Sequence, residues 1–348
     1  MKPRIYLDHN ATTALRPQAR AAMIAAMDCI GNPSSVHAEG RTAKNIVERA
    51  RAQVAAAVGA SGADVVFTSC ATEAAALALA ARGLLGSEIE HDAVLGWIDP
   101  SLPVDAQGQV TITDPATATL QLANSETGVI QTLPQGIAVS DVTQAIGRIP
   151  FAYSWSGVGM IFLSAHKLGG PKGVGALVFA QGTELAAQIK GGGQEMGRRS
   201  GTENVAGIAG FGAAAEAAAQ ELVDGVWDRV AKLRNILEEA LAVTSKDTIF
   251  VGNGAKRLPN TACFITPGWK GETQVMAMDL AGYAISAGSA CSSGKVKASR
   301  VLRAMGYGDD LAASAVRISL GPDTTKDEVL RFAQDWGDKL KRHRTRAA

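Results

Sequence analysis

Residues 159–173 read GMIFLSAHKLGGPKG, and the prediction of the fold starts from this stretch. An apolar run leads into His166 and Lys167 and then into a glycine-rich turn. A short apolar run bounded by turn residues predicts a buried β-strand that ends just before Lys167. The stretch alone leaves two interpretations of Lys167 open. It is either a solvated charge at a strand end, or a buried amine with a lowered pKa that reacts with an aldehyde.

Similar apolar runs recur along the chain and alternate with helical segments. Residues 63–70, 117–124 and 175–180 are rich in β-forming residues, whereas residues 41–60 and 210–242 are rich in alanine and helical in their spacing. This alternation predicts an α/β fold with a large, mostly parallel sheet. Polar residues follow three of the expected strands, and the carboxyl ends of parallel strands meet at one crevice. We therefore expect residues 70–72, Asn124 and residues 164–167 to converge there.

The sequence pattern changes after about residue 220, where a long charged helix is followed by β-like and helical segments. This order predicts a smaller α+β domain. We expect an N-terminal segment at residues 1–15, a large α/β domain at residues 16–245, and a small domain at residues 246–348 that carries a cysteine-containing loop. The small domain is expected to include the N-terminal segment.

Composition narrows the class of protein. The 348 residues contain 34 Lys and Arg against 33 Asp and Glu, a net charge of +1, so no strong field favours nucleic acid or an anionic membrane. No apolar stretch approaches the roughly 20 residues of a membrane-spanning helix, and the N-terminus lacks the order of a secretory signal. The four cysteines are scattered singly, which suits a reducing compartment. We expect a cytoplasmic protein whose partners are small molecules and proteins.

An aldehyde cofactor such as pyridoxal phosphate needs a phosphate cradle, an acidic partner for its ring nitrogen, a flat partner for its ring and a polar group for its phenolic oxygen. Residues 69–72 break a strand before an alanine-rich helix, so the backbone amides and the Thr72 hydroxyl could bind an anion. The alternative is an ordinary helix N-cap. Asp141 could face the ring nitrogen or only cap a helix, and Gln144 could reach the phenolic oxygen. His91 could stack on the ring or be a surface histidine.

Two further residues are candidates for the chemistry. Cys291 lies among Ser, Gly and Ala in SAGSACSSG, a composition that favours an exposed, reactive thiol over the alternative of a spare thiol. Cys263, by contrast, has apolar neighbours that are typical of a core cysteine. Arg317 lies inside an apolar strand, where its guanidinium needs a carboxylate. That carboxylate could come from an amino-acid substrate or from an internal salt bridge. Arg199 is similarly placed before a Gly-Thr turn.

Seven sequence blocks in order carry a family resemblance. They are YLDHNATT (6–13), GNPSSVH (31–37), FTSCATE (67–73), ANSETGV (123–129), SAHKLGGPKGVGAL (164–177), RRSGTENV (198–205) and SAGSACSSG (286–294). In this set and order the chain resembles the cysteine desulfurases, fold-type I enzymes of the class V aminotransferase group that use pyridoxal 5'-phosphate. The cysteine block is similar to that of the subgroup with a longer mobile loop.

The resemblance implies a role for each candidate residue. Lys167, Cys291 and His91 would be catalytic: Lys167 forms the Schiff base, His91 stacks on the ring, and the Cys291 thiolate attacks the substrate sulfur. The implied cofactor contacts are Ala71, Thr72, Ser164 and His166 around the phosphate, Asn124, Asp141 and Gln144 around the ring, and Thr202 from the neighbouring subunit of a homodimer. Arg317 and Asn32 would bind the substrate. Cys291 is also a candidate transient ligand of an iron–sulfur cluster.

The implied reaction converts L-cysteine to L-alanine and leaves a persulfide on Cys291 for an iron–sulfur scaffold or another sulfur acceptor. Two alternatives stay open: another class V activity, such as a selenocysteine lyase or an aminotransferase, and a trimmed scaffold without catalysis. The chain is shorter than the family pattern at residues 92–123 and 129–140. Cys70 stands where the family commonly has glycine.

Overall fold

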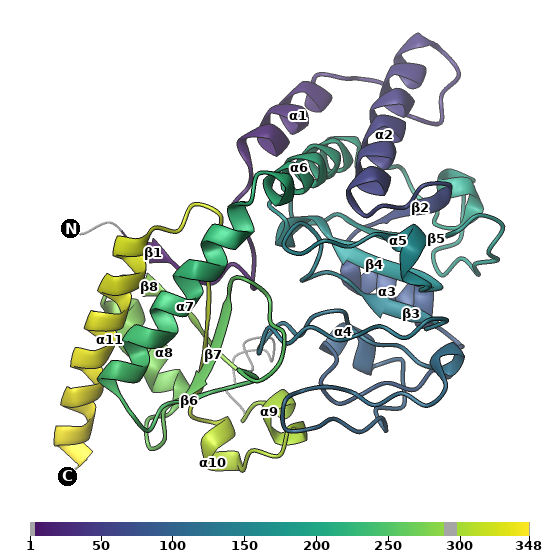
Figure 1. Ribbon diagram of the computed structural model, residues 1–348. Helices are drawn as coiled ribbons and strands as arrows, with labels where there is room; N and C mark the ends of the chain where they lie inside the picture. Colours follow the sequence, from purple (N-terminus) through teal and green to yellow (C-terminus); the bar gives the residue numbers. More distant parts are fainter. Residues whose placement is uncertain (1–3, 289–297, 348) are drawn as a thin grey trace.

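The computed structural model describes residues 4–288 and 298–347 (Figure 1). The strands are β1 (Ile5–Tyr6), β2 (Ala63–Thr68), β3 (Val139–Asp141), β4 (Met160–Ser164), β5 (Gly175–Ala180), β6 (Ile249–Phe250), β7 (Thr261–Ile265), β8 (Tyr283–Ala284), β9 (Ser286–Ala287) and β10 (Ala315–Ser319). The α-helices are α1 (Pro17–Met27), α2 (Ala38–Ala57), α3 (Ala71–Leu79), α4 (Asp92–Leu95), α5 (Tyr153–Ser156), α6 (Val205–Val223), α7 (Val226–Thr244), α8 (Gly271–Leu280), α9 (Arg300–Ala304), α10 (Asp309–Ala312) and α11 (Lys326–Ala347). Three 3₁₀-helices are η1 (Pro115–Thr117), η2 (Ala165–Lys167) and η3 (Gln194–Gly197).

The larger part of the molecule is built on a sheet with the strand order β2-β5-β4-β3. Strand β5 pairs antiparallel with both β2 and β4, while β3 pairs parallel with β4. Strands β2, β4 and β3 therefore run in one direction and β5 alone runs against them. The mostly parallel α/β fold expected from the sequence is confirmed, and the carboxyl ends of β2, β3 and β4 lie at the same edge of the sheet.

Both faces of this sheet are buried, which explains why its strands are continuous apolar runs. Side chains of a strand alternate between faces. Val65, Ile161 and Val178 share a core with helices α1, α2 and α6, whereas Phe162 and Phe179 pack with α3 on the opposite face. Figure 1 shows α1, α2 and α6 above the sheet, whereas α3 overlaps the strands β4 and β3 in this view. The sheet is thus a rigid platform between two helical layers.

The strand that we expected over residues 117–124 does not form a continuous ladder. Its backbone contacts with β3 include a parallel bridge from Thr119 to Val139 and hydrogen bonds from the Leu120 amide to the Val139 carbonyl and from the Leu122 amide to the Asp141 carbonyl. Isolated bridges also join Ala118 to Leu85 and Ala123 to Ile130. Between α4 and β3 the only regular element described is η1. The segment therefore follows the edge of the sheet through isolated bridges.

The smaller part contains a second four-stranded sheet with the order β6-β7-β10-β9. The N-terminal segment belongs to this smaller part, since β1 pairs parallel with β8 in a separate two-stranded sheet and both Ile5 and Leu7 are buried in the same core as α11. Helix α7 also packs in this core through Trp227 and Leu237, although the predicted boundary at residue 245 assigned it to the large domain. The change of core falls between α6 and α7, and the domain division itself stays a prediction.

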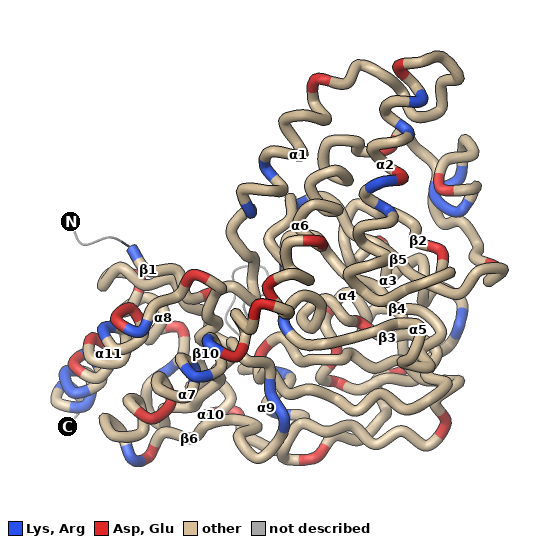
Figure 2. Tube along the Cα trace, turned by 45° about the horizontal axis from the view of Figure 1, so that its top comes forward, with Lys and Arg blue, Asp and Glu red and all other residues tan. Residues whose placement is uncertain are grey.

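Charges are spread over both parts of the molecule. Figure 2 shows Lys and Arg interspersed with Asp and Glu along the trace, in agreement with the net charge of +1. Across residues 4–288 and 298–347, none of the helices combines the length and apolar character needed to cross a membrane.

Candidate active site

A cavity of about 220 Å³ opens at the carboxyl ends of β2, β3 and β4. Its lining consists of Cys70, Ala71, Thr72, His91, Ala93, Gln121, Ala123, Ser125, Asp141, Thr143, Gln144, Phe162, Ser164, His166 and Lys167. The cavity therefore collects eight of the residues that the sequence singled out for cofactor binding, from segments more than ninety residues apart along the chain.

One wall of the cavity is the start of helix α3. Within the described residues no side chain caps this end of the helix, so the amides of its first turn are left for water or for a ligand. An anion is favoured at such a helix end by the helix dipole. The turn before α3 lies so close to β5 that a Cβ added to Gly175 would come within 2.5 Å of the Cys70 carbonyl carbon. Glycine at position 175 therefore lets the turn lie directly on the sheet.

Lys167 lies at the end of η2, directly after β4, and its side chain is half-buried. Its Nζ donates to the backbone carbonyl of Asn10 at 2.6 Å and to that of Ala11 at 2.8 Å. Both acceptors belong to the N-terminal segment, which places the amine between the two parts of the molecule. Lys172, five residues later, is exposed and outside the cavity.

Asp141 ends strand β3 and lies in the lining of the cavity. Burial raises the pKa of this carboxyl, while hydrogen bonds from Thr143 and the charges of His91 and Lys167 oppose that shift. The Thr143 amide donates to Asp141 Oδ1 at 2.8 Å. Asp141 therefore does cap the following turn, and its second oxygen can still contact a cationic group in the cavity.

His91 and His166 lie in the wall of the cavity as well. His91 caps α4, and its Nδ1 accepts the Ala93 amide at 3.1 Å, so the neutral ring has its proton on Nε2. His166 Nδ1 is 3.1 Å from Thr12 Oγ1. Burial, together with the charges of Lys167 and Lys172, lowers the pKa of His166 to about 4. His166 is neutral at pH 7 and can donate or accept one hydrogen bond.

Four predicted site residues do not line the cavity. Asn124 caps the turn at residues 125–127: its Oδ1 accepts the Thr127 amide at 2.9 Å and its Nδ2 donates to the Ile89 carbonyl at 3.0 Å. Asn32 lies in the exposed loop before α2. Thr202 is exposed and lines a separate small pocket together with Arg199. None of these three residues is part of the cavity lining.

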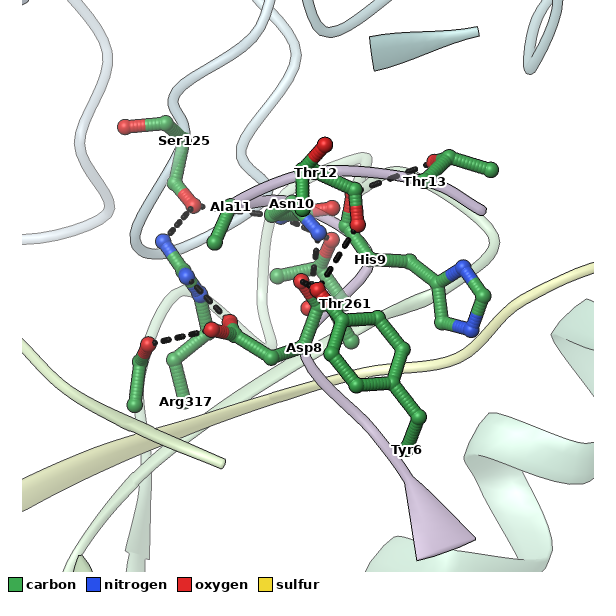
Figure 3. Close-up of polar contacts among 12 residues, drawn as sticks. Tyr6, Asp8, His9, Asn10, Ala11, Thr12, Thr13, Ser125, Thr261 and Arg317 are labelled. Carbon is green, nitrogen blue, oxygen red and sulfur yellow. Dashed lines mark hydrogen bonds and ion pairs between the residues drawn. The ribbon is translucent and has the colours of Figure 1, made fainter. Parts of the chain in front are cut away.

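Arg317 is the fourth of these residues, and Figure 3 shows its contacts. The guanidinium is buried on β10, and its Nη2 donates to Asp8 Oδ1 at 2.6 Å. Its Nη1 donates to the Ser125 carbonyl at 3.0 Å, and its buried Nε has no hydrogen-bond partner in the part of the chain that the structure describes. Asp8 also accepts a hydrogen bond from the Ser286 hydroxyl. Of the two partners that the sequence left open, the internal salt bridge is the one present.

The cysteines differ in where they lie and in their surroundings. Cys291 lies outside the described residues. Burial raises the pKa of the Cys263 thiol to about 12, so it is not a thiolate at neutral pH. Cys70 lines the cavity at the N-cap of α3. Among residues 4–288 and 298–347, His, Cys, Asp and Glu form no group of three or more that could hold a metal ion.

The sequence did not point to Gln121, Ser125, Thr143 or Phe162 as lining residues. Phe162 was read only as part of a strand, and it lines the cavity from within β4. Gln121 and Ser125 come from the irregular edge segment, whose position follows from tertiary contacts. Nothing in the local pattern could have identified them.

Comparison with known proteins agrees with this architecture. The family model for class V aminotransferases matches residues 5–95 and 102–332. A cysteine desulfurase IscS from Dictyoglomus turgidum is 36% identical over 94% of this chain and 92% of its own length. A cysteine desulfurase from a Frankia strain is 40% identical over 93% of this chain and 88% of its own length. The chain belongs to the cysteine desulfurases of the class V aminotransferase family.

Solved structures agree as well. A NifS-like protein from Rickettsia africae superposes with a TM-score of 0.86 at 31% identity, and the match covers 98% of this chain and 99% of that one. A structure described as SspA in complex with cysteine has a TM-score of 0.74 at 26% identity and covers 92% of this chain and all of that one. The fold-type I architecture expected from the sequence is therefore confirmed.

Proposed function

We propose that this protein is a cysteine desulfurase that uses pyridoxal phosphate to convert L-cysteine to L-alanine and leaves the sulfur as a persulfide on Cys291. The observation that carries the proposal is the cavity in which Lys167, Asp141, Gln144 and His91 converge. Relatives that are 34–40% identical over most of the chain are named cysteine desulfurases, which supports the same reaction.

Class V aminotransferases and cysteine desulfurases depend on pyridoxal phosphate, and the residues of this cavity fit that cofactor. The uncapped start of α3 offers amides for a phosphate. Asp141 is a buried carboxylate that would hold a proton at the ring nitrogen, and Gln144 offers an amide for the phenolic oxygen. Bound there, pyridoxal phosphate would supply an aldehyde for amines and an electron-withdrawing ring.

The chain's own groups would then act in turn. Lys167 Nζ, which now donates to two carbonyls, would take the proton from the substrate Cα and return it. His91 would cover the ring and exclude water. The Cys291 thiolate would attack the substrate sulfur, so that an Sγ–S bond forms while the Cβ–S bond breaks. The electron pair of the broken Cβ–S bond and the proton of the substrate thiol would then form the new C–H bond of the alanine methyl group, which leaves the persulfide on Cys291.

Substrate and partners complete the proposal. Arg317 would bind the cysteine carboxylate, and it would then share or exchange its present contact with Asp8. Asn32 would assist from the loop before α2. Thr202 would reach the phosphate bound by the second subunit of a homodimer, which accounts for its exposed position away from the cavity. A sulfur acceptor in the cytoplasm would take the persulfide.

A chemical trapping experiment tests the cofactor assignment. The purified protein is loaded with pyridoxal phosphate and reduced with borohydride, and its peptides are analysed by mass spectrometry. We expect the cofactor mass on Lys167, and on the same residue in Lys172→Ala, a control variant that removes the exposed neighbouring lysine. Labelling of Lys172, or of surface lysines in general, contradicts the proposal.

Release of alanine and sulfur tests the reaction. Cys291→Ala is expected to lose release of alanine from cysteine while it keeps the bound cofactor. If alanine release is unchanged, the transfer through this thiol is wrong and another class V activity, such as selenocysteine lyase, becomes the better description.

A further inference from the structure

Arg148 is a buried cation that the proposed reaction does not use. It lies in the turn after Gln144, and only 3% of its surface is exposed. No carboxylate within the described ranges pairs with it, and the charges that bear most on it are those of Arg317 and Arg16, both cations. These charges and burial lower the pKa of Arg148 to about 9. Burying a guanidinium without a neutralising carboxylate costs free energy of folding, so we expect this arginine to have a specific role.

Neutral oxygens satisfy the guanidinium. Its Nη1 donates to the side-chain oxygens of Asn10, at 2.9 Å, and of Gln144. Its Nη2 donates to the carbonyls of His9 and Lys167, each at 3.1 Å. One side chain therefore contacts the N-terminal segment, the backbone of the proposed Schiff-base lysine and a residue in the cavity wall. The planar fork of arginine can make these contacts together, whereas a lysine ammonium is a single point.

The contact with Gln144 determines which way its amide faces. Arginine only donates hydrogen bonds, so the atom of Gln144 that meets it must be the oxygen. The amide nitrogen is then on the other side, where one N–H donates to the Asn10 carbonyl at 2.9 Å. Gln144 also lines the cavity, so its second N–H is available to a ligand there. The opposite amide orientation would present an oxygen and repel an anionic ligand oxygen.

We propose that Arg148 is a positioning residue that fixes the Gln144 amide as a hydrogen-bond donor toward the cavity, and so selects a cofactor with an anionic phenolic oxygen. This inference rests on the proposed function, because it needs pyridoxal phosphate in the cavity. The same guanidinium holds Asn10, whose backbone carbonyl accepts both Gln144 Nε2 and Lys167 Nζ. Arg148 thereby holds the Gln144 donor and the Lys167 amine in a fixed arrangement relative to each other.

A double-mutant cycle tests the inference. The dissociation constant of pyridoxal 5'-phosphate is measured by absorbance titration of cofactor-free protein for the wild type, Arg148→Met, Gln144→Met and the double variant. We expect Arg148→Met to weaken binding roughly tenfold in the wild-type background and less than about twofold in the Gln144→Met background. Equal factors in both backgrounds overturn the inference, because Arg148 would then act independently of Gln144.

Further variants separate orientation from stability. Arg148→Lys keeps the charge and is expected to bind the cofactor as weakly as Arg148→Met. Arg234→Met is the matched control: this half-buried arginine donates to the Leu258 carbonyl at 2.8 Å, away from the cavity. We expect it to change the melting temperature of the cofactor-free protein without a change in cofactor affinity. An equal loss of affinity in Arg234→Met overturns the inference.

One variant keeps the test decisive if Arg148→Met does not fold. Gln144→Glu retains an oxygen for Arg148 but cannot donate into the cavity, so we expect it to fold and to bind the cofactor as weakly as Gln144→Met. Wild-type affinity in Gln144→Glu overturns the inference. A wild-type protein that does not bind pyridoxal phosphate contradicts the proposed function instead, and is recognised before any variant is made.

Discussion

Glu90 gives the clearest prediction of a pH effect. Its carboxyl group is 1% exposed and lies next to His91 in the chain. One oxygen accepts a hydrogen bond from the backbone amide of Gln121 at 2.7 Å, and the other is buried with no partner among the described residues. Burial, together with the charge of Asp141, raises the pKa of Glu90 from 4.5 to about 8. The carboxyl is therefore mostly protonated in the folded protein at pH 7.

The sign of the effect follows from this raised pKa. At low pH the carboxyl is neutral in both states, and above pH 4.5 the unfolded chain loses its proton first. The contribution of Glu90 to stability is thus complete below pH 4.5 and is lost as the pH rises to about 8. The difference between the two pKa values corresponds to about 5 kcal/mol in the free energy of unfolding.

Glu90→Gln isolates this contribution, because glutamine mimics the protonated acid and does not titrate. We expect the free energy of unfolding of the variant, relative to that of the wild type, to increase by about 3–5 kcal/mol as the pH rises from about 5 to about 9. Urea denaturation measures this difference. Glu88→Gln, which removes an exposed carboxylate two residues away, should follow the wild type. A constant difference between Glu90→Gln and the wild type at all pH values would refute the reasoning.

Three further variants test other parts of the structure. Gly175→Ala places a methyl group against the Cys70 backbone. We expect cofactor affinity, measured by titration, to fall more than about tenfold, and the free energy of unfolding, measured by urea denaturation, to fall by about 1–3 kcal/mol. Unchanged affinity would contradict the close contact. Glu195→Gln breaks a buried ion pair with Arg51 and should lower the free energy of unfolding, measured by urea denaturation, by about 3 kcal/mol; an unchanged free energy of unfolding would contradict this. Asp8→Asn removes the carboxylate partner of the proposed substrate-binding arginine, and a lower KM for cysteine is expected; a raised KM would show that Asp8 supports that arginine.

The sequence predicted the strand ends better than the sheet edge. Lys167 was predicted at the end of a strand because the apolar run before it is strong and ends in polar residues. Asp141 was not predicted there, although it ends the short strand β3. Since parallel strands place such ends together, the cavity follows from local patterns. The reversed direction of β5 could not be predicted, because an apolar run does not encode the direction of a strand.

The residues missed by the sequence are those positioned by distant contacts. Arg148 lies in a turn between Gly and Ile and looks like a surface arginine, yet its partners at the N-terminus lie about 140 residues away along the chain. Gln121 lies in a segment without a regular ladder, so no periodicity marks it. Helix α7 has an apolar face, but only the tertiary structure shows that this face packs against α11 and β7 and not against the larger sheet.

The most direct test of the central claim is a stoichiometric assay. The purified protein with bound pyridoxal phosphate is mixed with L-cysteine and a reductant, and alanine and sulfide are measured over the same time course. The account predicts that both appear continuously in equal amounts, and that Lys167→Ala releases neither. Sulfide accompanied by pyruvate in place of alanine, or no release of either product by the wild type, would contradict it.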